Sequence, residues 1–262
     1  MEELERIKLK IREGKPVVGT NIVLSDSSVT EIFGRIGYDF VWIDLEHAPN
    51  DRQELKLHMI AASAAGVAPF VRIPWNDPVL VKPVLELGPA AVIFPMIRSA
   101  EEAVRAVRSC LYPPEGIRGY GPVRAIDYGL KDRKEYLGEA ARIWKIMQIE
   151  HVDAVENLES ILAVEGVDSI VAGPMDLAAS VGMLHEPGHQ VVQRLMDRMA
   201  EVAVKSHVPL GTSIGYDLQS IRRWIDRGAS WFGVGSDVAF LVRTGQEVLR
   251  TVREAISEKA GP

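Results

Sequence analysis

Residues 143–176 read IWKIMQIEHVDAVENLESILAVEGVDSIVAGPMD, and their pattern gives the clearest indication of the fold. Two short runs, at 143–149 and 169–172, are almost continuously apolar, as parallel strands are when both of their faces are covered. Between them, at 152–163, apolar residues recur every three or four positions, which is typical of an amphipathic helix. The stretch therefore predicts one strand–helix–strand unit of a parallel sheet.

The same alternation continues along the whole chain. The predicted strands are 17–23, 40–45, 69–73, 91–96, 143–149, 169–172, 210–214 and 231–234. The predicted helices are 30–36, 53–65, 79–87, 101–108, 152–163, 191–205, 218–226 and a last helix at about 238–256. Eight such repeats predict an α/β protein, a (β/α)₈ TIM barrel that forms a single domain over residues 1–262. A doubly wound open sheet is the main alternative.

Composition and charge argue against several classes of function. The chain has 30 Lys and Arg against 36 Asp and Glu, a formal net charge of −6, and no long basic run, so nucleic-acid binding is not expected. No apolar stretch approaches the roughly 20 residues that cross a bilayer, and the N-terminus lacks the apolar core of a signal peptide. The single cysteine, Cys110, cannot form an internal disulfide. We expect a cytoplasmic protein that binds no membrane.

Two acids, Glu150 and Asp176, follow successive predicted strands, at the end of the barrel where active sites of this fold lie. A pair of carboxylates, completed by water and substrate oxygens, suits a hard divalent cation such as Mg²⁺ or Mn²⁺. Each acid can instead serve the helix that follows it, because acids in a first turn stabilise a helix by about 0.3–1 kcal/mol. The residues by themselves leave both interpretations open.

Further polar side chains follow the second and third predicted strands. The run after the second strand brings Asp44, Glu46 and His47 together, and Arg72 ends the third strand. A buried guanidinium needs a partner, so Arg72 either forms a salt bridge with one of these acids or binds an anionic ligand, and the two roles are compatible. His47 is the one histidine at a strand end, a position that suits acid–base chemistry.

The motifs around these residues resemble the HpcH/HpaI family of class II, metal-dependent pyruvate aldolases, which includes 4-hydroxy-2-oxoheptanedioate and 2-dehydro-3-deoxyglucarate aldolases. The matching segments are WIDLEHAPND at 42–51, VRIPWNDP at 71–78, YPPEGIRG at 112–119, QIE at 148–150, EGVD at 165–168 and GPMDL at 173–177. They occur in the family's order and extend over nearly the whole chain. The resemblance implies a TIM barrel of the phosphoenolpyruvate/pyruvate-domain type.

The resemblance also implies roles for individual residues. Glu150 and Asp176 would ligate the metal ion, Mg²⁺ or Mn²⁺ with Co²⁺ as an alternative. The implied catalytic residues are His47 and Asp44, around a metal-bound water, together with Arg72, which stabilises the enolate, and Glu86, at the position of the carboxylate that pairs with the histidine. The implied substrate-binding residues are Arg72, Gln148 and the segment Gly173, Pro174, Met175 and Asp176, whose backbone amides would receive the pyruvate carboxylate.

The implied activity is that of an aldehyde-lyase (EC 4.1.2.-), which reversibly cleaves a 4-hydroxy-2-oxo acid to pyruvate and an aldehyde through a metal-stabilised enolate. Two alternatives are a carbon–carbon lyase for CoA thioesters, of the malyl- or citramalyl-CoA type, and a non-catalytic barrel that serves as a scaffold. The resemblance further implies a homo-oligomer, a hexamer built as a trimer of dimers that exchange their C-terminal helices. The wide apolar face of the last predicted helix agrees with such an exchange, and the alternative is that this face docks on its own barrel.

One stretch, 112–127, interrupts the alternation with many glycines and prolines. Long loops in compact enzymes are often lids or binding loops. Arg118 and Arg124 would then meet an anionic group. The alternative is that the stretch packs against a neighbouring subunit.

Overall fold

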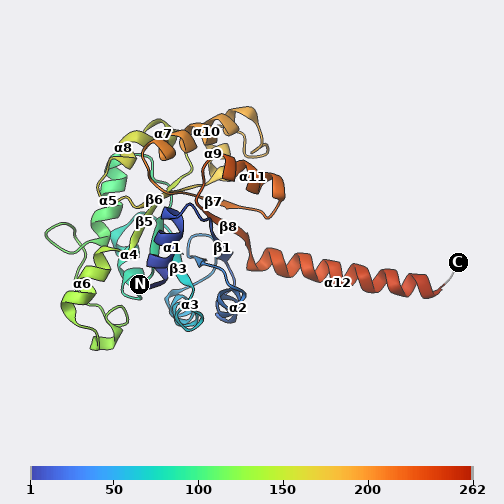
Figure 1. Ribbon diagram of the computed structural model, residues 1–262, viewed down its shortest axis with the longest axis horizontal. Helices are drawn as coiled ribbons and strands as arrows, with labels where there is room; N and C mark the ends of the chain where they lie inside the picture. Colours follow the sequence, from blue (N-terminus) through green and yellow to red (C-terminus); the bar gives the residue numbers. More distant parts are fainter. Residues whose placement is uncertain (1, 261–262) are drawn as a thin grey trace.

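The structure is a computed structural model that describes residues 2–260, so Met1, Gly261 and Pro262, which the predicted domain includes, lie outside the described residues. Eight parallel strands close into a barrel in which neighbours along the sequence are also neighbours in space (Figure 1). They are β1 (Val17–Ile22), β2 (Phe40–Asp44), β3 (Ala68–Arg72), β4 (Ala91–Phe94), β5 (Trp144–Ile149), β6 (Ser169–Ala172), β7 (Leu210–Ile214) and β8 (Trp231–Ser236). The predicted TIM barrel is confirmed, and every strand boundary lies within two residues of its prediction.

Most helices also lie where the periodicity predicts them. These are α2 (Ser28–Ile36), α3 (Arg52–Ala65), α4 (Pro78–Leu85), α5 (Ala100–Cys110), α10 (Gln190–Lys205), α11 (Leu218–Asp226) and α12 (Asp237–Ala260). The single helix predicted at 152–163 is wrong, because it divides at Asn157 into α7 (Val152–Glu156) and α8 (Leu158–Leu162). Asn157 is the N-cap of α8, but its side chain does not cap this helix. Its side-chain amide donates to the backbone carbonyl of Arg98, in the loop after β4, at 3.1 Å.

Three helices lie outside the predicted ones. They are α1 (Glu2–Arg12), α6 (Arg133–Ala141) and α9 (Pro174–Ser180), to which a short 3₁₀ turn, η1 (Asp127–Gly129), can be added. Each buries only two side chains, in α6 those of Tyr136 and Ala140. So few buried positions leave a weak signal for α6 and α9, whereas α1 does carry a helical period in Leu4, Ile7 and Ile11 that the strand–helix alternation did not include.

Aromatic side chains fill the inside of the barrel. Phe40 and Phe70 stack with their ring centroids 4.6 Å apart, and Trp231 packs edge-on against both. Two glycines make room for these rings, because a Cβ at Gly19 would lie 2.5 Å from Phe40 and one at Gly211 would lie 2.0 Å from Trp231. Aromatic side chains therefore fill the barrel interior below the carboxyl ends of the strands, where ligand sites of this fold lie.

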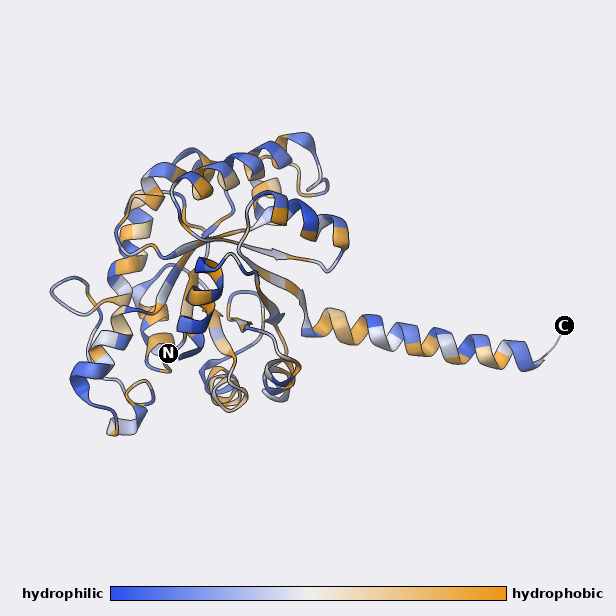
Figure 2. Ribbon diagram, in the orientation of Figure 1, coloured by the Kyte–Doolittle hydropathy of each residue, from blue (hydrophilic) through white to orange (hydrophobic). Residues whose placement is uncertain are grey.

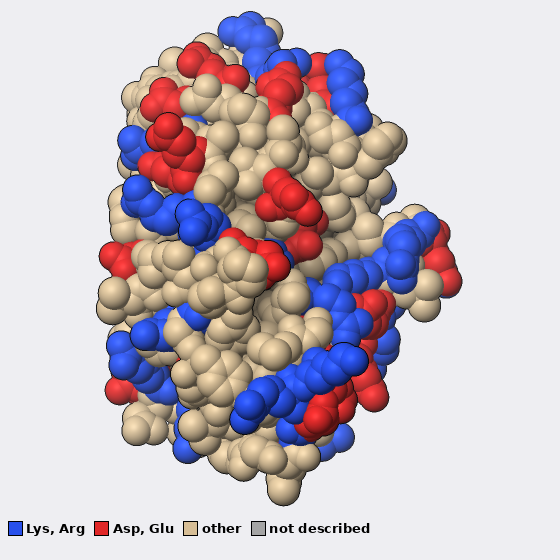
Figure 3. Space-filling model, turned by 90° about the vertical axis from the view of Figure 1, so that its left-hand side faces the viewer, with Lys and Arg blue, Asp and Glu red and all other residues tan. Residues whose placement is uncertain are grey.

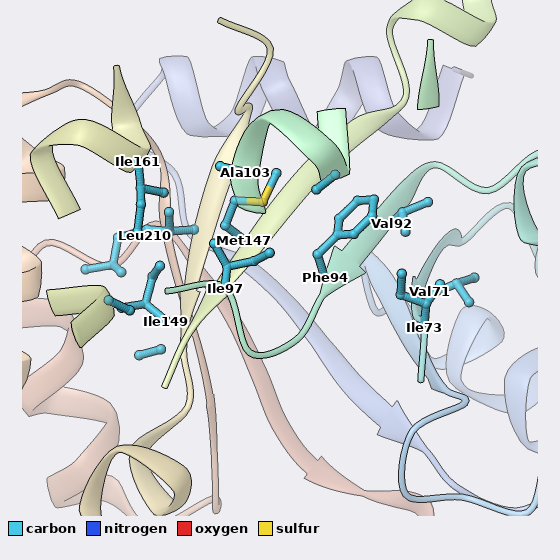
Figure 4. Packing of buried hydrophobic residues seen from close by; sticks show 14 of the residues in the cluster. Val71, Ile73, Val92, Phe94, Ile97, Ala103, Met147, Ile149, Ile161 and Leu210 are labelled. Atoms are coloured by element: carbon cyan, nitrogen blue, oxygen red, sulfur yellow. The ribbon is translucent and has the colours of Figure 1, made fainter. Parts of the chain in front are cut away.

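A second apolar layer lies between the sheet and the surrounding helices. Figure 4 shows part of it, where Met147 of β5 lies beside Ala103 of α5, and Leu210 of β7 lies between Ile149 of β5 and Ile161 of α8. Together the two layers hold the strands rigidly, so that the side chains at their ends are fixed in place.

The last helix, α12, leaves this compact body. It projects away from the barrel (Figure 1), and every residue from 241 to 259 is exposed. Figure 2 shows hydrophobic residues recurring along this helix, and in the sequence they extend from Val238 to Ile256. Within residues 2–260, no helix is long and apolar enough to cross a membrane.

Candidate active site at the strand ends

The polar side chains predicted to meet at the strand ends do so because of the alternation within each strand. Phe70 points into the barrel, so Arg72, two residues later on β3, points inward as well. The same spacing turns Gln148 inward above Trp144 and Ile146 on β5. These polar side chains form a layer above the aromatic interior.

Arg72 lies at the centre of an ion-pair cluster. Its Nε and Nη2 donate to the two carboxylate oxygens of Asp44 at 3.0 and 2.7 Å, and its Nη1 lies 3.2 Å from Oε2 of Glu46. Burial alone would lower the pKa of Arg72, but the hydrogen bonds and charges of these acids raise it. The predicted salt bridge is confirmed, and Arg72 is a fixed positive charge.

Glu46 belongs to this site, although the sequence suggested for it only a salt bridge with Arg72. Burial raises its pKa to about 7, opposed by Arg72 and reinforced by the charges of Asp44 and Asp176. The signal that places it here is its position in the Asp44–His47 run, directly after a buried strand. A carboxyl group with this pKa can exchange a proton near neutral pH.

His47 lies at the rim of the site. Its side chain is 63% exposed, and its Nε2 is 3.6 Å from Oε2 of Glu46. Its backbone N–H lies 3.4 Å from Oδ1 of Asp44, which also accepts from the N–H of Glu46 at 2.9 Å. Asp44 therefore orders both the loop that carries His47 and the guanidinium of Arg72.

Glu86 requires a correction. Helix α4 returns from the end of β3 to the start of β4, so Glu86, just after it, lies at the opposite end of the barrel from His47. Its carboxylate pairs with Arg118, with Oε1 and Nη2 3.1 Å apart. Within one chain, therefore, Glu86 is not the partner of His47. A prediction based on chain position alone could not show that α4 carries this acid away from the strand ends.

The two arginines of the 112–127 stretch do not face the strand ends either. Arg118 is buried, and its Nη2 also donates to the Tyr136 hydroxyl at 2.9 Å. Arg124 donates to the backbone carbonyl of Met59 and to Oγ of Ser63, both at 3.0 Å. Both arginines attach the stretch to its own chain, so neither acts as an anion-binding lid residue in this structure.

Glu150 is held tightly, with only 2% of its surface exposed. The backbone N–H of Met96 donates to its Oε1 at 2.6 Å, and the side-chain amide of Gln148 donates to its Oε2. Gly173 leaves the space it needs, because a Cβ there would lie 2.7 Å from Oε2. Burial raises the pKa of Glu150 to about 7, which the two donors oppose and the charges of Asp176 and Glu46 reinforce.

The alternative that these acids cap helices is wrong for Glu150. The N-cap of α7 is His151, whose Nδ1 accepts from the backbone N–H of Asp153 at 3.2 Å. Asp176 lies in the first turn of α9, after the N-cap Gly173, with its side chain exposed. It can act on the helix dipole and still offer its oxygens to a ligand.

The donor set fits a divalent cation. Among the described residues, Glu150 has no ion pair with a lysine or arginine, and the charge of Asp176 disfavours its ionised form. A cation between the two carboxylates would offset both the burial of the Glu150 charge and its repulsion by Asp176. The described residues contain no group of three or more His, Cys, Asp or Glu side chains that would hold a metal unaided. Water and substrate oxygens would complete the coordination, as they do for Mg²⁺.

Known proteins resemble this chain over nearly its whole length. A family model for HpcH/HpaI aldolase/citrate lyase matches residues 19–244. The chain is 37% identical to a hydroxypyruvate/pyruvate aldolase of Paraburkholderia phytofirmans over 94% of this chain and 97% of that protein. It is 35% identical to a 4-hydroxy-2-oxo-heptane-1,7-dioate aldolase of Escherichia coli over 91% of each. An HpcH/HpaI aldolase/citrate lyase family protein from Burkholderia cenocepacia has a similar crystal structure, with a TM-score of 0.88, 33% identity, and 95% and 99% of the two chains covered.

Proposed function

Because this chain belongs to the HpcH/HpaI aldolase/citrate lyase family, we propose that it reversibly cleaves a 4-hydroxy-2-oxo acid to pyruvate and an aldehyde. It would then be a carbon–carbon lyase of the aldehyde-lyase class. The observation that carries the proposal is the buried carboxylate of Glu150, which lies at the same end of the barrel as Asp176 and the fixed charge of Arg72.

Glu150 and Asp176 are the residues that would hold the metal ion, Mg²⁺ or Mn²⁺ with Co²⁺ as an alternative. When bound, such an ion polarises the carbonyl of a 2-oxo acid as a Lewis acid. Gln148 orients Glu150 by donating a hydrogen bond from its side-chain amide to Oε2 of the carboxylate. The backbone amides at the start of α9, between Gly173 and Asp176, would receive the substrate carboxylate.

Side chains of the protein would stabilise the developing charge and transfer the protons during the retro-aldol cleavage. The C4 hydroxyl loses its proton, the C3–C4 bond breaks to release the aldehyde, and the electron pair moves to the C2 carbonyl oxygen. Arg72, oriented by Asp44, stabilises the negative charge that develops there. Return of a proton to C3 gives pyruvate. We assign the proton transfers to His47, with Glu46 beside it.

A substrate panel tests this function. Purified protein is assayed in the aldol direction with pyruvate or hydroxypyruvate, several aldehydes, and Mg²⁺, Mn²⁺ or Co²⁺. The expected result is aldol formation that EDTA abolishes and added metal restores. Activity that is insensitive to EDTA would overturn the metal role.

The same panel includes malyl- and citramalyl-CoA, to test the thioester alternative. A CoA diphosphate needs a cluster of basic side chains, and on the face shown in Figure 3 basic and acidic side chains are interspersed. Turnover of a thioester but of no free oxo acid would replace the proposed function. Isothermal titration with oxalate and Mn²⁺ that detects no binding would favour the non-catalytic scaffold.

We also propose that α12 docks on a second copy of the chain, in a hexamer built from dimers that exchange this helix. An isolated helix is marginally stable in water, and α12 has a stripe of exposed apolar residues along its 24-residue length. These are Val238, Leu241, Val242, Val248, Leu249, Val252 and Ile256, between 39% and 63% exposed. Light scattering on Leu249→Glu should show a smaller particle than wild type, whereas Arg250→Glu, which lies outside the stripe, should not. A monomeric wild type would overturn the exchange.

A further inference from the structure

Met96, two residues after the end of β4, adopts an unusual backbone conformation. Its φ is +56°, in the left-handed region that non-glycine residues rarely enter. The other described non-glycine residues with positive φ are Asp127 and Tyr128 in η1 and His207 after α10. Met96 is thus the one described case at the strand ends. Such a conformation costs on the order of 1–3 kcal/mol and persists only where neighbouring contacts enforce it.

Contacts on the outer side of this turn enforce it. The side chain of Ile97 is completely buried in the layer between sheet and helices. The backbone N–H of Arg98 donates to the Glu102 carboxylate at 2.6 Å, and its carbonyl accepts from the Asn157 side chain at 3.1 Å. Residues from α5 and from the α7–α8 junction therefore hold the turn in place.

On the side of the turn that faces the barrel, the conformation of Met96 determines a contact with Glu150. It directs the N–H of Met96 at Oε1 of Glu150, 2.6 Å away, while Gln148 donates to Oε2. Each carboxylate oxygen thus has one donor, and the carboxylate cannot rotate. An extended residue at position 96 would point its N–H elsewhere, because φ sets the direction of the preceding peptide plane.

We propose that Met96 is a positioning residue, whose left-handed backbone orients the Glu150 carboxylate for a divalent cation. The inference rests on the proposed function, since it assumes that Glu150 ligates the metal. According to this proposal, metal affinity depends on the backbone conformation of residue 96 and not on the methionine side chain. Removing partners that orient a metal ligand typically weakens metal affinity about 10- to 100-fold.

Calorimetric titration of the metal-free full-length protein with Mn²⁺ tests this. Met96→Gly keeps access to positive φ, so it should bind Mn²⁺ within about threefold of wild type. Met96→Val, whose branched side chain strongly disfavours positive φ, should bind about 10-fold or more weakly. Equal affinity of the valine variant and wild type overturns the inference, and so does a glycine variant as weak as the valine variant.

A second pair of variants decides the matter if Met96→Val does not fold. Asn157→Ala removes one outer contact of the turn and should weaken Mn²⁺ binding several-fold, with circular dichroism confirming the fold. Met96→Gly in the Asn157→Ala background should restore the affinity, because glycine needs little enforcement at positive φ. Undiminished binding by Asn157→Ala, or absence of rescue, overturns the inference. A wild-type protein that binds no Mn²⁺ overturns the proposed function itself.

Discussion

The Arg72 guanidinium binds both carboxylate oxygens of Asp44, through Nε at 3.0 Å and Nη2 at 2.7 Å. The two residues are direct partners in the register of β2 and β3, so the sheet itself aligns them. Their side chains are only 13% and 4% exposed. A buried bidentate pair of this kind fixes the direction of the guanidinium as well as its charge.

Replacing Asp44 by alanine should therefore destabilise the protein. The change leaves Arg72 buried without its bidentate partner, which typically costs about 3–5 kcal/mol, and Glu46 compensates only in part. Urea unfolding measures the loss in free energy of unfolding. Glu13→Ala, which breaks an exposed pair with Lys15, is the control and should change stability by about 0.5 kcal/mol or less. A variant at Asp44 as stable as wild type would contradict the structural role.

The raised pKa of Glu150 predicts an unusual pH dependence of stability. Its folded pKa is about 7, above the ordinary value of 4.5, so folding favours the protonated form. The cost to the metal-free protein is absent below about pH 4.5, grows as pH rises toward 7, and is constant above it. Glu150→Gln should therefore be more stable than metal-free wild type at pH 8, by up to about 3 kcal/mol, and no more stable at pH 4.

Thermal unfolding at pH 4 and pH 8, with and without Mn²⁺, checks this prediction. Added Mn²⁺ should stabilise wild type at pH 8 and leave Glu150→Gln unchanged, because the amide cannot neutralise the cation. A Glu150→Gln protein that is less stable than metal-free wild type at pH 8 would show that the carboxylate is not penalised in the folded state.

His47 offers a test of chemistry without an effect on stability. Its exposed ring makes few contacts, so His47→Ala should leave the melting temperature unchanged, while kcat for aldol cleavage falls about 100-fold or more if the ring transfers protons. His185→Ala, which changes another exposed ring, is the matched control and should leave kcat unchanged. A kcat that stays within about threefold of wild type for His47→Ala would move proton transfer to another group, with Glu46 next in line.

The sequence predicts the barrel well because strand and helix periods are local. Continuous apolar runs such as 169–172 need no information from elsewhere in the chain. The same is true of Arg72 and Glu150, whose positions at strand ends follow directly from the strands. The position of Glu86 could not be predicted in this way. Its ion-pair partner, Arg118, depends on where α4 ends and not on the residues next to Glu86 in the sequence.

Met96 marks a different limit of prediction. Its contribution is a backbone N–H, which every residue except proline possesses, and its conformation depends on contacts that the backbone of the nearby Arg98 makes with Glu102 and Asn157 on other elements. No property of a methionine in the sequence distinguishes such a position. Backbone donors of this kind become visible only in three dimensions.

Gly173 gives the last prediction, in which space alone is changed. A Cβ at this position would lie 2.7 Å from both Cβ and Oε2 of Glu150 and 3.3 Å from Nε2 of Gln148. Gly173→Ala should therefore push the carboxylate away from its donors and weaken Mn²⁺ binding about 10-fold or more, measured by calorimetry. Gly138→Ala is the control, because a Cβ there has no neighbour within 4 Å, and in the interior of α6 it should slightly stabilise the protein. If Gly173→Ala binds Mn²⁺ as tightly as wild type, the tight packing around Glu150 does not control the metal site.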